Sequence, residues 1–465
     1  MITFYNTATR SKQEFIPIEN NKVKFYACGP TIYNYSHIGN FRAYMFYDLM
    51  NRFLRYKGFD VTFAMNLTDV DDKTIRDSRA ANKSLREFTD FYADAFFKDF
   101  ETLNIKKPDY IIRATEEIDS MIELINLLLE KGYAYKASSG DVFFKISAFK
   151  DYGQMAGIKL NQLRANADGR LADEYEKEDA QDFALWKAYT EKDGDVFWET
   201  PFGKGRPGWS LECSAMARKY LGQPIDMHLG GVDLIFPHHT NEIAQSECAY
   251  GTKFVNYWIH NAHITVNGKK MAKSAGNFYT VNDLLDKGYT PLSIRYELLK
   301  SHYRVTMDFN EKNLTGNQTV IEKLSNFINR LNETKTGSGW QEVDKAILDV
   351  KTEFDAGLDD DLNMPVALAS LFTFVGEVNK HFEELSTSDA HKIIQQMYQF
   401  DMILGILPDL NVQKELTEEQ MNLINERQQY RLEKNWAKAD ELKKVLLEQG
   451  IEIKDTPQGP VWTIK

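Results

Sequence analysis

Short apolar runs alternate with long amphipathic segments in the first part of the chain. The run at residues 22–29 ends in Gly29-Pro30 and predicts a buried strand. An apolar stripe at helical spacing follows, made of Ile38, Phe41, Met45, Leu49, Phe53 and Leu54. Gly58 suits the left-handed end of that helix, and residues 61–65 predict the next strand. A strand, a helix and a strand in this order predict a parallel, nucleotide-binding sheet.

This pattern is then interrupted. Thr115 is placed to cap a helix that runs to Gly132, and a hairpin is predicted to turn at Ser138-Ser139-Gly140. The parallel pattern resumes with a strand at residues 225–229, a helix from about 238 to 250 and a strand around 257–263. We therefore expect one sheet that is interrupted by an inserted subdomain.

The remainder of the chain changes character after about residue 308. Amphipathic helices follow one another, and the segment 361–365 opens one of them with a proline suited to a first helical turn. The tail predicts a helix through residues 436–447, a stop at Gly450 and two short strands around a turn at 457–459. We expect a helical bundle, a linker at 337–339 within it, and a small mixed module at the end.

Composition narrows the class of protein. The 465 residues exceed one hydrophobic core and suggest three or four modules, and 43% hydrophobic with 27% charged residues is typical of a globular protein. The net charge of -12 argues against a general basic coat, so nucleic acid would have to bind at local basic patches. Neither a signal core nor a run of 18 apolar residues occurs, and we expect a cytoplasmic protein without a membrane span.

Two polar motifs suit the binding of a triphosphate. His37-Ile38-Gly39-Asn40 falls where the first strand gives way to a helix, a place where free amides and the helix dipole favour phosphate. Lys269, Lys270 and Lys273 lie together in a turn without an acidic partner, as in loops that neutralise a leaving pyrophosphate. Each motif has a plainer interpretation, an ordinary helix start and a solvated hairpin respectively.

A third group of residues has the chemistry of a metal site. His238 and Glu242 are four apart on a predicted helix and share a face, and Cys28 and Cys213 would complete a sulfur, nitrogen and oxygen set for zinc. Three cysteines are too few and too far apart for a disulfide framework, and Cys248 points elsewhere. His239 is a rival ligand, and buried cysteines beside a capping histidine pair are the alternative without metal.

Taken together, these motifs resemble the class I aminoacyl-tRNA synthetases, and among them the cysteinyl-tRNA synthetase family, over the whole chain. The signature near residue 37 and the lysine loop at 270–274 match in order, although Ala272 stands where that loop usually has serine and Asn435 where the tail often has aspartate. The resemblance implies ATP-dependent activation of L-cysteine and its transfer to tRNA(Cys). It implies one zinc ion per chain that selects the substrate thiolate, and Mg²⁺ with ATP. We also expect a monomer.

The resemblance further implies a role for each matched residue. The implied zinc ligands are Cys28, Cys213, His238 and Glu242. The catalytic residues would be His37, Asn40, Lys270 and Lys273, and ATP would in addition contact Gly39, Gly230, Gly231 and Asp233. Cysteine would lie against Cys28, Gly29, Thr68 and Trp209, and the anticodon against Arg431, Trp436, Asp440 and Asp455. For the last group the plainer interpretation is a solvated helix with Trp436 buried.

The expected fold class is α/β, with a Rossmann-type parallel sheet, an inserted subdomain, an α-helical bundle and a small mixed C-terminal module. The predicted boundaries are 1–112 and 205–262 for the two halves of the catalytic domain, 113–204 for the insertion, 263–310 for a stem-contact region, 311–408 for the bundle and 409–465 for the anticodon module. Two other functions stay open: a ligase that joins cysteine to an aminosugar, and a catalytically silent RNA-binding paralogue.

Overall fold

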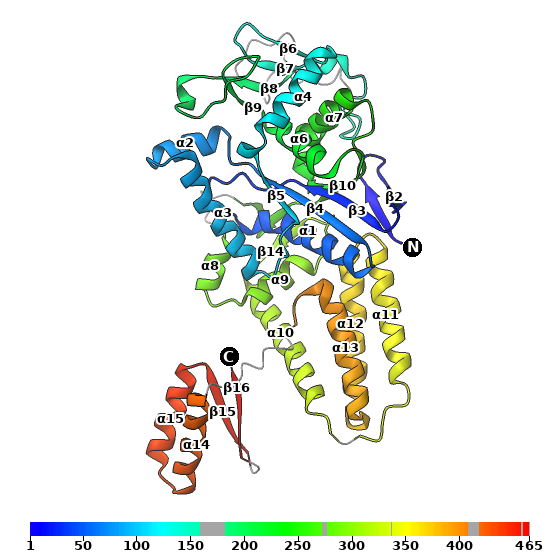
Figure 1. Ribbon diagram of the computed structural model, residues 1–465. Coiled ribbons are helices and arrows are strands. Elements are labelled where there is room, and N and C mark those ends of the chain that lie inside the picture. Colours follow the sequence, from blue (N-terminus) through cyan, green and yellow to red (C-terminus); the bar gives the residue numbers. More distant parts are fainter. Residues whose placement is uncertain (159–181, 272–276, 336, 408–417, 457–458, 465) are drawn as a thin grey trace. The chain divides into compact units, whose positions relative to one another are not determined.

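A five-stranded parallel sheet organises the first part of the chain (Figure 1). The computed structural model describes residues 1–158, 182–271, 277–335, 337–407, 418–456 and 459–464. Contacts divide the chain into two units, Met1–Ile406 and Leu407–Lys465, and each is described by itself. The six predicted boundaries are finer than this division and stay predictions.

The strand order of the sheet creates a crevice for a ligand. The order is β11-β10-β3-β4-β5, with β3 at Lys22–Ala27, β4 at Asp60–Leu67, β5 at Tyr110–Arg113, β10 at Ile225–Gly231 and β11 at Val255–Asn261. All four pairings are parallel, and helix α1, Ile38–Tyr56, connects β3 to β4. Successive strands run outward in opposite directions from β3 and β10, so the order reverses between these two. Ligands of open α/β sheets bind outside the carboxyl ends of the strands at such a reversal. The predicted α/β fold class is confirmed.

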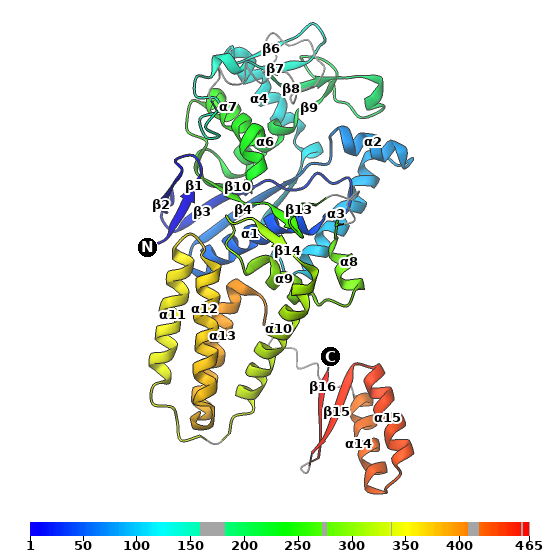
Figure 2. The same ribbon diagram turned by 180° about the vertical axis from the view of Figure 1, so that it is seen from behind.

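A second, smaller sheet is formed by strands within the predicted insertion at 113–204 and by one strand directly after it. Its antiparallel strands are β6 (Ala134–Lys136), β7 (Val142–Phe144), β8 (Phe183–Ala188) and β9 (Gly205–Pro207). The hairpin between β6 and β7 turns where the sequence predicted, with Gly140 at a positive φ of 94°. Helices α4 (Ile118–Glu130), α6 (Trp209–Leu221) and α7 (Thr240–Tyr250) pack together at the same end of the unit (Figures 1 and 2).

Two predicted helix starts are wrong. Thr115 does not cap α4, because it lies in the short 3₁₀ turn Ala114–Glu116 and its hydroxyl donates to Asp69 Oδ2 at 2.6 Å. Helix α7 begins at Thr240 and not at about residue 238, since the backbone of Phe236 is extended and the wide turn Ile235–His239 precedes the helix. Both histidines of the metal motif therefore belong to this turn.

Helices dominate the rest of the first unit. Between β4 and β5 lie α2 (Asp72–Ala80) and α3 (Leu85–Thr102), and the chain opens with the hairpin of β1 (Thr3–Asn6) and β2 (Ser11–Glu14). A three-stranded sheet of β12 (Ile264–Val266), β13 (Lys269–Lys270) and β14 (Met307–Phe309) is accompanied by α8 (Val281–Asp286) and α9 (Pro291–Leu299). The predicted bundle is α10 (Glu311–Asn332), α11 (Val343–Asp359), α12 (Met364–Lys380) and α13 (Thr387–Leu404), of which α11 and α12 lie side by side (Figure 2).

The second unit has the predicted mixed pattern. Helices α14 (Glu418–Leu432) and α15 (Trp436–Glu448) precede the antiparallel pair β15 (Ile451–Thr456) and β16 (Gly459–Ile464). Its small core consists of Ile424, Leu446, Ile451 and Ile453. Within the described ranges of both units, no helix has the length and apolar character that crossing a bilayer requires.

Candidate active site and metal centre

The four predicted metal ligands converge at the reversal of strand order. Cys28 directly follows β3, Cys213 lies on α6, and His238 and Glu242 lie on either side of the start of α7. All four side chains are buried, and one ligand atom from each lies within 4.8 Å of the others. The two sulfur atoms are 3.8 Å apart, and His238 Nε2 is 3.2 Å from Glu242 Oε1. Residues as much as 214 positions apart along the chain thus form one cluster.

A second arrangement shares two of these ligands. Cys28 and Glu242 also lie within 4.8 Å of His228 and His239. His228, on β10, bonds to Glu242 Oε2 at 2.8 Å, and His239 lies between Cys28 Sγ at 3.3 Å and the ring of His260 at 2.7 Å. The sequence interpretation named His239 as a rival ligand but missed His228. Its position inside the predicted strand at residues 225–229 was the available signal.

Hydrogen bonding distinguishes the two arrangements. Both ring nitrogens of His239 are engaged by neighbours, at Cys28 and His260. Both ring nitrogens of His238 are buried and make no hydrogen bond of acceptable geometry within the described ranges. Since buried polar atoms are nearly always satisfied, an imidazole that lies beside two sulfurs and a carboxylate without a well-formed hydrogen bond fits a metal ligand. The set of Cys28, Cys213, His238 and Glu242 therefore has the donors that suit zinc.

The electrostatics divide the four ligands of the cluster: the pKa values of Glu242 and Cys213 are lowered, whereas those of Cys28 and His238 are raised. Although burial alone would raise it, the pKa of Glu242 is lowered to about 2, because His228 and then His238 stabilise the carboxylate. Burial likewise opposes the shift at Cys213, but the hydrogen bond from Cys28 lowers the pKa of that thiol to about 6. Burial raises the pKa of Cys28 well above its usual value, with Cys213 adding to the effect. One of the two sulfurs is thus readily a thiolate near neutral pH.

The residues expected to bind cysteine lie around this cluster. A Cβ at Gly29 would come within 1.7 Å of the Asn66 carbonyl oxygen, so only glycine fits beside β4 at that point. The Thr68 hydroxyl donates to Glu212 Oε2 at 2.7 Å, directly beside Cys213. The indole of Trp209 is half exposed, and its ring centroid lies 4.2 Å from that of His238. Glu212 was not a sequence candidate, and burial and then Cys213 raise its pKa well above the usual value.

The two ends of the phosphate motif cap helix α1 reciprocally. His37 Nδ1 accepts the Asn40 backbone N–H at 3.2 Å, and Asn40 Oδ1 accepts the His37 N–H at 3.1 Å. A Cβ on Gly39 would lie 2.8 Å from the His37 ring, which explains the glycine between them. The Ile38 N–H donates to the carbonyl of Tyr279, so the start of α1 is joined to the segment after the lysine loop.

The lysine loop is described only in part. Asn267 and Gly268 form a turn with positive φ, and Lys269–Lys270 pairs with β12. The side chain of Lys270 and all of Ala272 and Lys273 lie outside the described residues, so their roles stay predictions. At the end of β10, a Cβ on Gly230 would come within 2.4 Å of the His239 ring, and one on Gly231 within 2.4 Å of Asp233 Oδ1.

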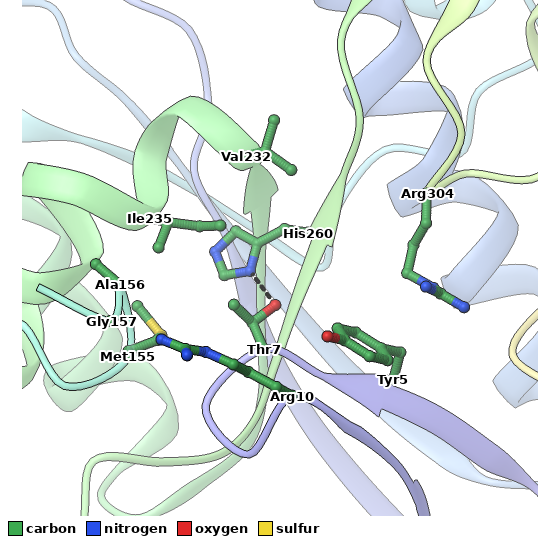
Figure 3. Close-up of a pocket in the computed structure, with 10 residues that line it drawn as sticks. All are labelled: Tyr5, Thr7, Arg10, Met155, Ala156, Gly157, Val232, Ile235, His260 and Arg304. Atoms are coloured by element: carbon green, nitrogen blue, oxygen red, sulfur yellow. Dashed lines mark hydrogen bonds between the residues drawn. The ribbon is translucent and has the colours of Figure 1, made fainter.

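A cavity of about 490 Å³ is lined by residues that include His260 (Figure 3). Val232 and Ile235, from the turn after β10, line one side, and Arg10 and Arg304 line others. His260 faces the cavity and connects it with the cluster, because Nδ1 bonds to Thr7 Oγ1 at 2.8 Å and Nε2 to His239.

In the second unit, an aromatic plane is available at the start of α15. The Trp436 side chain is 55% exposed, which contradicts the interpretation that buries it. The Arg431 guanidinium lies 5.6 Å from the centre of its ring, and Asp440 is exposed one turn further along α15. Asn435 caps the helix by accepting the Lys438 N–H. Asp455 belongs to β15, but its side chain lies outside the described residues.

Comparison with known proteins places this geometry in a family. Residues 14–319 match the tRNA synthetases class I (C) catalytic domain, and residues 353–408 match the DALR domain. The chain is 47% identical to a cysteine–tRNA ligase of Protochlamydia amoebophila (98% of this chain, 97% of the other) and 48% identical to one of Brachyspira hyodysenteriae (100% and 99%). The chain belongs to the cysteine–tRNA ligase family. It is therefore an enzyme, a class I aminoacyl-tRNA synthetase, as the sequence resemblance implied.

Solved structures agree on the fold at much lower identity. A Mycobacterium tuberculosis methionyl-tRNA synthetase in complex with methionyl-adenylate is 18% identical and has a TM-score of 0.61 over 83% of this chain and 90% of that one. An Agrobacterium radiobacter leucyl-tRNA synthetase in a ternary complex with tRNA and LeuAMS is 10% identical, with a TM-score of 0.60 over 84% and 85%. These likenesses support the class I architecture of this family.

Proposed function

We propose that this synthetase is a cysteine–tRNA ligase. It activates L-cysteine with ATP to cysteinyl-adenylate and pyrophosphate, and it then transfers cysteine to the 3′-terminal adenosine of tRNA(Cys). The observation that carries the proposal is the buried cluster of Cys28, Cys213, His238 and Glu242 at the crevice of a class I sheet. Full-length similarity to proteins named cysteine–tRNA ligase supports it.

The four residues of the cluster would hold zinc. A bound zinc ion supplies a soft centre that takes a thiolate and gains little from a hydroxyl, which distinguishes cysteine from serine of nearly the same size. The protein's own contribution is to hold the donors in a buried place where Glu242 stays ionised and Cys213 is readily a thiolate. Trp209 and Thr68 would then enclose the rest of the amino acid.

Positioning and charge would accomplish the activation step. The cysteine carboxylate would attack the α-phosphorus of ATP and pyrophosphate would leave, while Mg²⁺ bound with ATP would neutralise phosphate charge. His37, Asn40 and the positive end of the α1 dipole would bind the phosphates, with Gly39 allowing close approach. Lys270 and Lys273 would neutralise the leaving group. Gly230, Gly231 and Asp233 would border the adenosine.

The second unit would recognise the anticodon. Exposed Trp436 offers a plane on which an unpaired base can stack, and Arg431 beside it adds a positive charge for the phosphate backbone. Asp440 and Asp455 would accept hydrogen bonds from base edges. The inserted subdomain would contact tRNA and would not edit misactivated amino acids.

One assay with two steps tests this function. Purified full-length protein loaded with zinc should exchange labelled pyrophosphate into ATP only when L-cysteine is present, and it should then charge tRNA(Cys). Exchange without transfer to tRNA would favour the ligase that uses an aminosugar. Binding of tRNA without exchange would favour the silent paralogue. Activation of serine as readily as cysteine would refute the role given to the cluster.

A further inference from the structure

We propose that an exposed aromatic patch, made of Tyr33, Tyr35, Phe91 and Tyr92, binds the single-stranded 3′ end of tRNA by stacking against its bases. The proposal rests on the proposed function, because it concerns how the acceptor end reaches the site of activation. Tyr33 and Tyr35 lie in the loop between β3 and α1, and Phe91 and Tyr92 lie on α3. Two segments that are distant in the sequence therefore share one surface.

The rings of the patch are held together but are not covered. Tyr35 and Phe91 are 42% and 49% exposed, and their ring centroids are 6.1 Å apart. Within the described ranges, no other two exposed aromatic side chains contact one another. Tyr92 packs edge to face with both rings, at 5.4 Å from Tyr35 and 5.1 Å from Phe91, and the buried Phe88 supports it at 5.1 Å. Exposed rings that are already in place offer flat faces on which bases can stack.

Two lysines bring positive charge to the patch. Lys73 of α2 has its Nζ 5.0 Å from the centre of the Tyr33 ring, and Lys83 has its Nζ 5.4 Å from the centre of the Phe91 ring. In the part of the chain that the structure describes, neither lysine forms an ion pair with a carboxylate. Cations beside exposed rings suit a ligand in which phosphates alternate with flat bases, and this is the chemistry of single-stranded nucleic acid.

The carboxylates nearby are already engaged. Asp77 pairs with Arg76 at 2.7 Å. Asp90 pairs with Arg113 at 2.6 Å, and Glu87 takes part in the capping box at the start of α3. The two lysines are thus the charges of the patch that a ligand can still neutralise, and that ligand must be an anion.

The location of the patch fits the acceptor end of tRNA. Tyr35 is two residues before His37, at the start of α1 where the phosphates of ATP would bind. Helix α2 also contacts the inserted subdomain, because Asp72 accepts from Lys187 of β8 at 3.0 Å. Transfer of cysteine requires the terminal adenosine to reach this site, so the unpaired nucleotides before it must pass over neighbouring residues. Aromatic side chains commonly bind such unpaired bases in RNA complexes.

The experiment compares two RNAs that differ only at the 3′ end. One is tRNA(Cys), the other is the same transcript without its unpaired 3′ nucleotides, and the binding of each to the full chain is measured by titration. In Phe91→Leu, which stays apolar but removes the ring, we expect the Kd for tRNA(Cys) to rise about fivefold or more. The Kd for the truncated RNA should change less than about twofold, and cysteine-dependent pyrophosphate exchange should stay unaltered.

Matched variants complete the test. Phe91→Tyr keeps the ring and should bind both RNAs as the unaltered protein does, whereas Tyr35→Leu should repeat the selective loss. The control is Tyr110→Leu, because Tyr110 is 43% exposed but begins β5, at the end of the sheet opposite to the crevice. This replacement should affect the binding of neither RNA.

Three results would overturn the proposal. Equal weakening of both RNAs would show that the rings contact another part of the tRNA. Undiminished binding by Phe91→Leu and Tyr35→Leu would indicate that the patch serves a protein partner. Loss of pyrophosphate exchange in these variants would show that the rings support the fold of the active site. Absence of cysteine-dependent exchange in the unaltered protein, with selective binding of the 3′ end retained, would instead refute the proposed function alone.

Discussion

Replacement of Asp48 by asparagine should destabilise the first unit strongly. Asp48 lies in the middle of α1, its side chain has no exposed surface, and it pairs with two arginines, Arg52 of the same helix and Arg295 of α9. Its oxygens accept hydrogen bonds from Arg52 Nε at 2.8 and 2.9 Å, from a terminal nitrogen of Arg295 at 2.7 Å and from the Lys106 N–H at 2.9 Å. Among the residues that the structure describes, Asp48 is the only anion that forms an ion pair with these two buried guanidinium groups.

The expected loss in the free energy of unfolding follows from the groups that Asp48→Asn leaves without a partner. The buried guanidinium groups of Arg52 and Arg295 would lose the negative charge between them. The NH2 group of the new asparagine would also face N–H groups that need an acceptor. Removal of one partner from a buried ion pair typically costs about 3–5 kcal/mol, out of the roughly 5–15 kcal/mol that stabilise a typical domain. Carbonyl groups at the ends of α3 and α13, at Leu103 and Leu404, also accept from Arg295, so part of its charge stays compensated. We therefore expect Asp48→Asn to lower the free energy of unfolding by about 3 kcal/mol.

Urea unfolding followed by circular dichroism measures this change. The control is Glu101→Gln, which removes the same charge from an exposed pair with Lys107 and should cost about 0–1 kcal/mol. If Asp48→Asn cost no more than this control, the reasoning from burial and hydrogen bonding would be refuted. A double variant that replaces Arg295 by methionine as well should recover part of the loss, since one unpaired charge is removed.

Three further changes test other parts of the structure. Cys213→Ser removes one sulfur of the cluster, and zinc retention and cysteine activation should fall together; metal content by mass spectrometry that stays unchanged would contradict its assignment as a ligand. Trp436→Ala should reduce kcat/KM for tRNA by about fivefold to a hundredfold, from roughly 1–3 kcal/mol of stacking, while pyrophosphate exchange stays unaltered; equal losses in both assays would indicate a folding defect. Asp99→Asn tests a pKa: burial raises the pKa of Asp99 from 3.8 to about 7, so the folded protein holds this proton more tightly than the unfolded chain. The free-energy cost of ionising Asp99 in the folded protein is absent below about pH 4, grows between pH 4 and 7 and is complete above pH 7. In urea unfolding, Asp99→Asn should therefore be more stable than the natural protein at pH 8 but not at pH 4.

Local patterns in the sequence were sufficient to predict most helices and strands of the fold. The apolar stripe between residues 38 and 54 depends only on neighbours along the chain, and it correctly predicted α1 and the parallel strands on either side. The prediction failed at Thr115, because a side chain suited to capping instead bonds to Asp69, 46 residues away in the sequence. It also failed at the start of α7, since Phe236 is extended and both histidines belong to the wide turn that precedes the helix.

The candidate metal ligands were identified from their chemical types and motif contexts, whereas the partners that orient them were not. The sequence could not show that His228 would bond to Glu242, or that Thr68 would bond to Glu212, because these pairs are 14 and 144 residues apart. Their contacts depend on which strands are neighbours and on which face each side chain lies. Spacing along the chain carries neither piece of information.

The sequence by itself determined the class of fold, the family and the residue types that can hold a soft metal, since periodicity and motif order are properties of the chain alone. Only the tertiary structure decided that Cys28 and Cys213, 185 positions apart, lie 3.8 Å from each other, and that His238 pairs with Glu242 whereas His239 bonds to His260. The physical reason is that a parallel sheet with its order reversed between β3 and β10 brings the ends of distant strands to one edge. Burial at that edge then sets the charges and the directions of the hydrogen bonds.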